Sequence, residues 1–184
     1  MIGPGGTVGI LGGGQLGRML ILAGRPMGYR FAVFEPSPAS TAGKLADRFF
    51  PHAYTDRAAL EAFAAEVDVV TLEFENIDKD ALEFLAAIKP VHPAPRVLEV
   101  CQHRRREKVF LRDAGIPHAA FRIARSADEL DRAVRELGRP AVVKTAAFGY
   151  DGKGQVAVRP EDAWDASSCL ASLGSPEALV VEQW

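Results

Sequence analysis

Two lysines and a group of glycines in the last third of the sequence have the residue types of a phosphate-binding hairpin. Lys144 ends a β-branched run, and a short apolar run follows at 155–158. The loop that leads into the second run contains three glycines and the second lysine: Gly149, Tyr150, Asp151, Gly152, Lys153 and Gly154, followed by Gln155. Glycines let backbone N–H groups approach an anion closely, and lysines can bring positive charge to a polyphosphate.

This loop differs from a Walker loop, because Gly154 and Gln155 follow Lys153 where that motif has Ser or Thr, and a strand follows rather than a helix. The pattern favours a β-hairpin that closes over a nucleotide. An ordinary flexible hairpin is the alternative, since Asp-Gly and Gly-Lys-Gly are common turn residues.

A second glycine-rich stretch follows the buried run at 7–11. Residues 12–17 fit G-x-G-x-x-G, and the residues after them recur at helical spacing. The free N–H groups and the dipole at the start of such a helix attract anions. Glu35 ends the next strand, near the place of the ribose-binding acid in dinucleotide folds. The stretch alone leaves open NAD binding and a purely structural role in tight helix-on-strand packing.

Acidic and amide side chains follow the buried strand at 68–72. Glu73, Glu75 and Asn76 come directly after it. The carboxyl ends of parallel strands meet at one edge of a sheet, so we expect Glu73 and Asn76 to face the same site as Gln15. A solvated loop carboxylate is the alternative for Glu73 and Glu75.

The elements that position these residues alternate between strands and helices. Strands are predicted at 7–11, 31–34 and 68–72, with a weak one at 53–54, and helices at 42–49, 58–66 (capped by Asp56) and 80–88. The later elements are helices at 97–101 and 104–114, a strand at 121–123, a helix from the capping box at Ser126 to Leu137, the hairpin, a helix from Pro160 and a strand at 178–184. The fold class is α/β: a Rossmann-like domain with an open parallel sheet, a helical connector and a small α+β lid.

Composition excludes several classes of protein. The net charge of -2 argues against nucleic-acid binding, and the basic run 104–106 is expected to be a solvated face with a single functional arginine. Cys101 and Cys169 are far apart, which indicates a reduced, cytoplasmic protein. The four histidines lack ligand spacing, so no metal site is predicted from them. No apolar run has the length of a membrane span.

The motifs together resemble the 5-(carboxyamino)imidazole ribonucleotide synthases, ATP-grasp ligases of purine biosynthesis. The resemblance rests on five stretches that occur in the family's order: 13–19, 71–76, Arg104 with Lys108, Lys144 with 149–155, and 181–183. It covers essentially the whole chain as the N-terminal half of such an enzyme, and it implies that the first glycine turn serves the phosphate of a ribonucleotide rather than NAD.

The resemblance also implies the reaction and the site residues. ATP phosphorylates bicarbonate, and the carboxyphosphate formed carboxylates 5-aminoimidazole ribonucleotide. The residues expected to bind ATP are Arg104, Lys144, Gly149, Tyr150, Asp151, Gly152, Lys153, Gly154, Gln155, Glu182, Gln183 and Trp184. Those expected to line the ribonucleotide site are Gly14, Gln15, Leu16, Glu73 and Asn76. The family is commonly homodimeric.

The implied domains are a preATP-grasp domain at 1–95, a connector at 96–118, a lid at 119–180 and a truncated adenine-hinge strand at 181–184. The family's Mg²⁺ ligands come after the position of Trp184, so the 184 residues alone are expected to be inactive, with Leu179–Val181 as an exposed, association-prone edge lacking its ATP-grasp sheet. His103 departs from the family, which has aspartate there.

The alternatives are another ATP-grasp enzyme, such as formate-dependent glycinamide ribonucleotide transformylase or biotin carboxylase, and a non-catalytic nucleotide-binding module.

Overall fold

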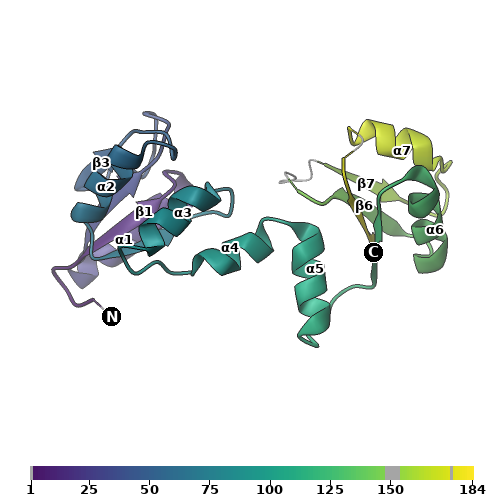
Figure 1. Cartoon of the computed structure of the whole chain (residues 1–184), viewed down its shortest axis with the longest axis horizontal. Coiled ribbons are helices and arrows are strands. Elements are labelled where there is room, and N and C mark those ends of the chain that lie inside the picture. Colours follow the sequence, from purple (N-terminus) through teal and green to yellow (C-terminus); the bar gives the residue numbers. More distant parts are fainter. Residues whose placement is uncertain (1, 148–153, 175) are drawn as a thin grey trace. The chain divides into compact units, whose positions relative to one another are not determined.

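The computed structural model describes residues 2–147, 154–174 and 176–184. The chain divides into two compact units, Met1–Glu99 and Val100–Trp184 (Figure 1). The first contains a parallel sheet and the second an antiparallel one, so the predicted α/β class is confirmed.

The sheet of the first unit has the strand order β3-β2-β1-β4, and every pairing in it is parallel. Its strands are β1 (Thr7–Leu11), β2 (Arg30–Phe34), β3 (Arg48–Phe50) and β4 (Val69–Leu72). The chain moves outward from β1 through β2 to β3 and then returns to the other side of β1 for β4. Ligands bind at such a reversal, outside the carboxyl ends of the strands.

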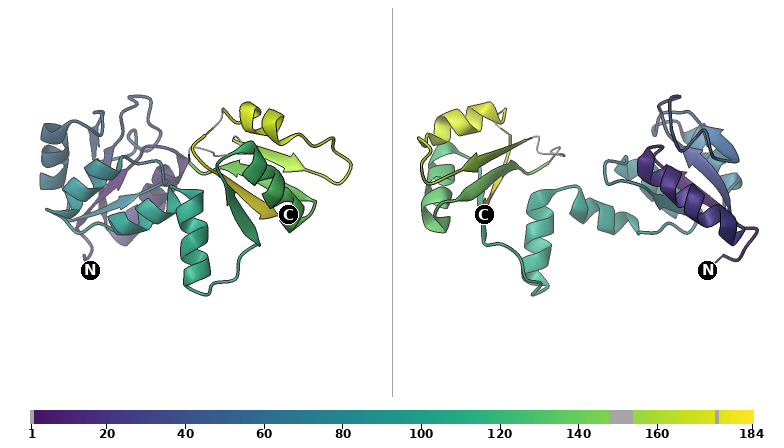
Figure 2. Two further views of the ribbon diagram at one scale, coloured as in Figure 1. Left: turned by 45° about the vertical axis from the view of Figure 1, so that its right-hand side comes forward. Right: turned by 180° about the vertical axis from the view of Figure 1, so that it is seen from behind.

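Helices cover both faces of this sheet. They are α1 (Gln15–Gly24), α2 (Arg57–Ala65) and α3 (Lys79–Ala86). The short 3-10 helix η1 (Arg25–Met27) follows α1, and α4 (Pro95–Cys101) contains the end of the first unit and the start of the second. Successive residues of a strand point to opposite faces. Accordingly, Ile10 packs with Ile21 of α1, whereas Leu11 packs with the core residues of α2 and α3. Figure 2 shows α1 lying across its face of the sheet.

The predicted helix at 42–49 and the predicted strand at 53–54 are wrong. Residues 41–45 form turns, the third strand is β3, and Ala53 and Tyr54 lie in a loop and turn. Asp47 holds this segment beside β2. Its backbone N–H donates to Phe31 O and its carboxylate accepts from Phe31 N, both at 2.8 Å. These bonds depend on β2, which a local helical pattern does not reveal.

The sheet of the second unit has the order β5-β8-β6-β7, and its pairings are antiparallel. Its strands are β5 (Phe121–Ala124), β6 (Ala141–Thr145), β7 (Gln155–Val158) and β8 (Leu179–Gln183). Its helices are α5 (Arg104–Asp113), α6 (Ala127–Leu137) and α7 (Ala166–Ser172). The predicted hairpin is confirmed as β6 and β7, with Lys144 opposite Gln155.

The two faces of this sheet have different roles. Val143 of β6 and Val181 of β8 belong to the apolar core beneath α6 and α7. Alternation along a strand turns Lys144 and Glu182 to the opposite face. On this opposite face Lys144 and Glu182 form an ion pair, and α5 approaches it through Lys108.

The prediction of an exposed apolar edge at residues 179–181 is wrong. β8 lies inside the sheet, hydrogen-bonded to β5 on one side and β6 on the other. Leu179 is 1% exposed, and the two valines after it are fully buried. The edges of the described sheet are instead β5 and β7.

The local capping signals are mostly correct. The side chains of Asp56 and Ser126 each accept a backbone hydrogen bond at the start of their helices, α2 and α6. The predicted helix start at Pro160 is wrong, because α7 begins at Ala166 after its cap, Asp165. The carboxylate of Asp162 accepts from Arg159 N and holds residues 159–162 as a turn.

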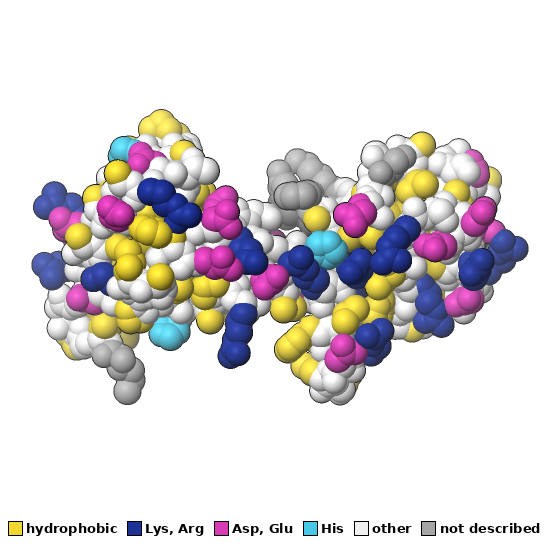
Figure 3. Space-filling view, viewed as in Figure 1, with side chains coloured by type: hydrophobic (Ala, Val, Ile, Leu, Met, Phe, Trp, Pro, Cys, Tyr) yellow, Lys and Arg dark blue, Asp and Glu magenta, His cyan; other side chains and the backbone are white. Residues whose placement is uncertain are grey.

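The surface shown in Figure 3 carries a mixture of charges, with lysine and arginine side chains interspersed with aspartate and glutamate on each unit. None of the described helices combines the length and the apolar character needed to span a lipid bilayer.

The two cysteines are expected to differ sharply in reactivity. Cys101 is exposed, whereas Cys169 lies in the core of the second unit, where burial raises the pKa of its thiol and keeps it protonated. Iodoacetamide at neutral pH should therefore add one group, at Cys101, in the native protein and a second only after denaturation. Mass spectrometry of peptides checks this. Modification of Cys169 in the native state at a rate similar to that of Cys101 would contradict it.

Candidate functional site

The carboxylate of Glu73 occupies the N-terminus of α1. Its Oε1 accepts from Gly14 N and its Oε2 from Gly17 N, both at 2.6 Å. The parallel pairing of β1 and β4 brings these groups together, because Leu11 lies opposite Leu72 and the next residue, Glu73, donates its N–H to Leu11 O at 3.1 Å. A carboxylate here satisfies free amides of the first helical turn and interacts favourably with the helix dipole.

The glycines of the turn are required by this close approach. Gly12 has φ of 98°, and a Cβ on it would lie 2.5 Å from Glu73 Cγ. A Cβ on Gly14 would lie 2.8 Å from Glu73 Oε1. The turn therefore needs glycine for backbone conformation and for space.

The structure thus brings together two of the residues predicted for the ribonucleotide site, Gly14 and Glu73. Gln15 and Leu16 begin α1 with exposed side chains, and Asn76 is exposed in the loop after β4. A substrate phosphate at the glycine turn would have to compete with the Glu73 carboxylate for the two amides. The prediction of a phosphate there stays a prediction.

Tyr54 is a neighbour of this turn that the sequence motifs did not indicate. Its hydroxyl is buried and forms no hydrogen bond within the described residues. Burial raises its pKa, and the negative charges of Glu35 and Glu73 raise it further, so the hydroxyl stays protonated and can donate. The only sequence signal was the position of Tyr54 shortly after a strand, β3, whose own position was predicted wrongly.

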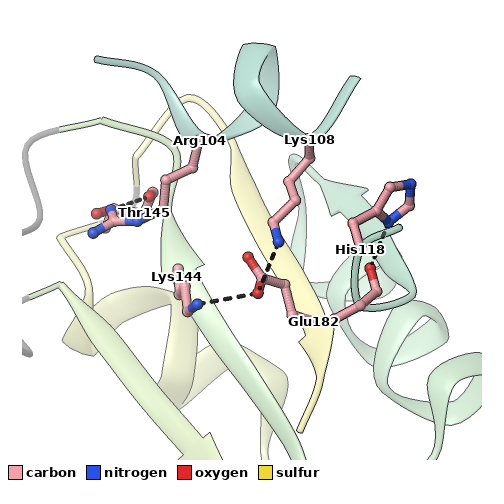
Figure 4. Close-up of polar contacts among 7 residues, drawn as sticks. Arg104, Lys108, His118, Lys144, Thr145 and Glu182 are labelled. Carbon is pink, nitrogen blue, oxygen red and sulfur yellow. Dashed lines mark hydrogen bonds and ion pairs between the residues drawn. The ribbon is translucent and has the colours of Figure 1, made fainter. Parts of the chain in front are cut away.

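The second unit gathers charge around Glu182. Lys144 Nζ lies 3.1 Å from Glu182 Oε2, and Lys108 Nζ lies 3.3 Å from the same oxygen (Figure 4). The sheet register explains the first contact: Val142 is directly opposite Glu182, and Lys144 is the next residue of β6 on the same face. Gln155, opposite Lys144 on β7, adds a polar group beside it.

Arg104 is held against β6. Its backbone N–H donates to Ala146 O and its Nη1 to Thr145 O, both at 2.8 Å. Arg104 and Lys108 lie on one face of α5, as their spacing predicted, and that face meets the sheet. The acidic partner of Lys108 is Glu182.

His103 precedes α5 without capping it through its side chain. Burial lowers the pKa of its imidazole, and Arg106 and Arg105 lower it further, which favours the neutral ring. His103 Nδ1 and Thr145 Oγ1 are buried and, within the described residues, form no hydrogen bond. The bonds of Arg104 to β6 thus form without an aspartate at position 103.

The last two residues, which were predicted to bind ATP, are held in place by backbone hydrogen bonds. Gln183 N donates to Ala120 O at 2.9 Å, and Trp184 N donates to Pro140 O at 3.1 Å. The side chain of Trp184 is exposed. Gly154 O accepts from Thr145 N at 2.9 Å. The other residues predicted for the phosphate loop, Gly149, Tyr150, Asp151, Gly152 and Lys153, lie outside the described residues.

Metal ligands are not gathered in the described part of the chain: no group of three or more histidine, cysteine, aspartate or glutamate side chains there could hold an ion. The described residues therefore do not fit a resident metal site.

Comparison with protein families defines the class. Residues 6–102 match the ribonucleotide synthetase preATP-grasp domain, and residues 109–184 match the ATP-grasp domain. The chain belongs to the ribonucleotide synthetase preATP-grasp family, and the match to the ATP-grasp domain follows it in the sequence.

The relatives within this class include N5-carboxyaminoimidazole ribonucleotide synthases. The chain is 39% identical to the synthase of Bacillus subtilis over 184 residues, covering 100% of this chain and 48% of the relative. It is 42% identical to the synthase of Pseudomonas aeruginosa over 173 residues, which cover 94% of this chain and 47% of the relative. The chain spans about half the length of the curated relatives it matches.

Solved structures of N5-carboxyaminoimidazole ribonucleotide synthases are also similar to this chain. An ADP complex of an N5-carboxyaminoimidazole ribonucleotide synthetase has a TM-score of 0.89 and 39% identity, covering 100% of this chain and 48% of its own. The Aspergillus clavatus synthase in complex with ADP and 5-aminoimidazole ribonucleotide has a TM-score of 0.77 and 27% identity. The match covers 97% of this chain and 46% of that synthase. The resemblance expected from the sequence motifs is confirmed.

Proposed function

We propose that the protein containing this chain is an ATP-dependent carbon–nitrogen ligase of purine biosynthesis. It carboxylates 5-aminoimidazole ribonucleotide with bicarbonate and forms N5-carboxyaminoimidazole ribonucleotide, ADP and phosphate. The observation that carries the proposal is the likeness of all 184 residues to a synthase of this name at 39% identity. The complex of the Aspergillus clavatus synthase with ADP and 5-aminoimidazole ribonucleotide supports the choice of ligands.

The reaction proceeds in two balanced steps. A bicarbonate oxygen attacks the γ-phosphorus of ATP, and ADP leaves. The substrate's exocyclic amine then attacks the carboxyl carbon of carboxyphosphate, phosphate leaves and the amine gives up a proton. Positive groups fixed beside the phosphates stabilise the charge on the transferred group. In this chain Lys144 and Arg104 supply such groups.

We assign the ATP site to the second unit and the ribonucleotide site to the first. Lys144 and Arg104 contact the phosphates. The backbone of β8 and Trp184 reads the adenine. Glu73 with the helix start at Gly14, Gln15 and Leu16, together with Asn76, lines the ribonucleotide site. In domain terms, residues 1–95 hold the ribonucleotide, 96–118 connect, 119–180 form the lid and 181–184 the adenine hinge.

The proposal also includes the metal, the oligomeric state and the location of the protein. We propose Mg²⁺ as the metal of the reaction, with ligands outside the described residues. We propose a homodimer in the cytoplasm, and two free cysteines fit a reducing compartment. The 184 residues alone are proposed to be inactive, because the relatives are about twice as long.

The test is phosphate release from ATP by the protein that carries this chain. We expect release that requires both bicarbonate and 5-aminoimidazole ribonucleotide, and none from residues 1–184 alone. Formate with glycinamide ribonucleotide, and biotin in place of the ribonucleotide, are the controls for other ATP-grasp enzymes. Turnover with either control, or by residues 1–184 alone, would contradict the proposal. Binding of the ribonucleotide without turnover in the longer protein would indicate a non-catalytic module.

A further inference from the structure

Glu182 is a buried carboxylate shared between two lysines from different elements. It lies on β8, Lys144 comes from β6 and Lys108 from α5 (Figure 4). The side chains of Glu182 and Lys108 are 10% and 15% exposed, and that of Lys144 is 25% exposed. Both ammonium groups approach the same oxygen, Oε2, so the carboxylate has one partner more than charge neutrality requires.

If Lys144 binds a phosphate, Glu182 and the phosphate compete for the same ammonium group. A buried carboxylate that loses its only partner is strongly destabilised, because neither water nor another charge compensates it. With Lys108 in place, Glu182 keeps a cation when Lys144 turns away. The partly exposed lysine is the one able to exchange, and the more deeply buried one is placed to remain.

We propose that Lys108 is a positioning residue for nucleotide binding. It neutralises Glu182 and so allows the Lys144 ammonium to exchange between that carboxylate and a nucleotide phosphate. This inference rests on the proposed ATP site. It gives Lys108 a role through Glu182 and Lys144, without contact between Lys108 and the nucleotide.

The Lys108→Met variant should therefore bind ADP more weakly by about tenfold, the size of one charge-assisted hydrogen bond. Among the described residues, Lys144 is then the sole cationic partner of Glu182. Binding of the Lys144 ammonium to a phosphate therefore leaves the carboxylate without a cation from these residues. Binding of adenosine, which has no phosphate, should not change. Lys108→Arg should restore ADP affinity, and Arg112→Met, on the same helix but paired with Asp113, should leave it unchanged.

A double-mutant cycle with Glu182→Gln separates this role from simple attraction of phosphate by positive charge. A neutral amide does not need a cationic partner, so Lys108→Met should change ADP affinity by less than about twofold in the Glu182→Gln background. Long-range attraction alone predicts the same loss in both backgrounds. Isothermal titration of ADP and adenosine into this chain gives the four affinities, and tryptophan fluorescence in urea verifies that each variant is folded.

The outcomes distinguish this inference from the function on which it rests. Coupled effects of the two substitutions on ADP, with adenosine unaffected, support the role of Lys108. Additive effects, unchanged ADP affinity in Lys108→Met, or equal losses for ADP and adenosine would overturn the inference and leave the ATP site standing. Failure of the unmodified chain to bind ADP at millimolar concentration would overturn the assignment of the ATP site and the inference together.

Discussion

Replacing Glu73 by alanine is expected to lower the free energy of unfolding of the first unit by about 3 kcal/mol, since hydrogen bonds to a charged group each contribute ~1.5 kcal/mol or more. The carboxylate accepts from Gly14 N and Gly17 N at 2.6 Å, and alanine leaves both amides without this partner. Glu73→Gln should have a smaller effect, because its carbonyl oxygen can accept one bond while its NH₂ group faces the other donor.

The two units provide an internal control for this measurement. Both tryptophans, Trp164 and Trp184, belong to the second unit. In urea, Glu73→Ala should shift the part of the circular dichroism transition that belongs to the first unit and leave the tryptophan fluorescence transition in place. Glu61→Ala, which removes an exposed carboxylate from α2, should shift neither. An unchanged circular dichroism transition in Glu73→Ala would show that the two bonds contribute little to stability.

The Lys144→Met variant is expected to lose ADP affinity by on the order of 10- to 100-fold, the range expected when a phosphate loses a hydrogen bond to a charged donor. The Lys144 ammonium is held on the charged face of the sheet by Glu182 at 3.1 Å, beside the position to which we assign the phosphates. Methionine keeps much of the side-chain length and removes the charge. Titration calorimetry with ADP measures the change.

Adenosine and a charge-matched variant make this result specific. Affinity for adenosine should be the same in Lys144→Met and in the unmodified chain, because adenosine lacks the phosphates. Arg132→Met, which removes an exposed positive charge from α6 in the same unit, should leave ADP binding unchanged. If Lys144→Met binds ADP normally, the phosphates lie elsewhere. If it loses ADP and adenosine equally, Lys144 supports the fold rather than the phosphates.

The sequence predicted most of the regular elements because their signals are local. The buried apolar runs at 7–11, 68–72 and 141–144 are strands, and Asp56 and Ser126 cap their helices. A capping side chain bonds amides two or three residues away, so residue order alone indicates it. The third strand was missed because it forms by pairing with residues 32–34 of β2, which lie 16 residues earlier in the sequence.

At the candidate sites, too, local sequence predicted the positions of the charged residues but not their partners. Residue types and spacing by themselves determined that Glu73, Lys144 and Glu182 end strands or lie on them, and that glycines precede α1. Only the tertiary structure decided their partners. The Glu73 carboxylate reaches amides 56 and 59 residues away, and Lys144 reaches Glu182 across 38 residues. These partners depend on strand order and register, which are set by packing of the whole sheet rather than by any short segment.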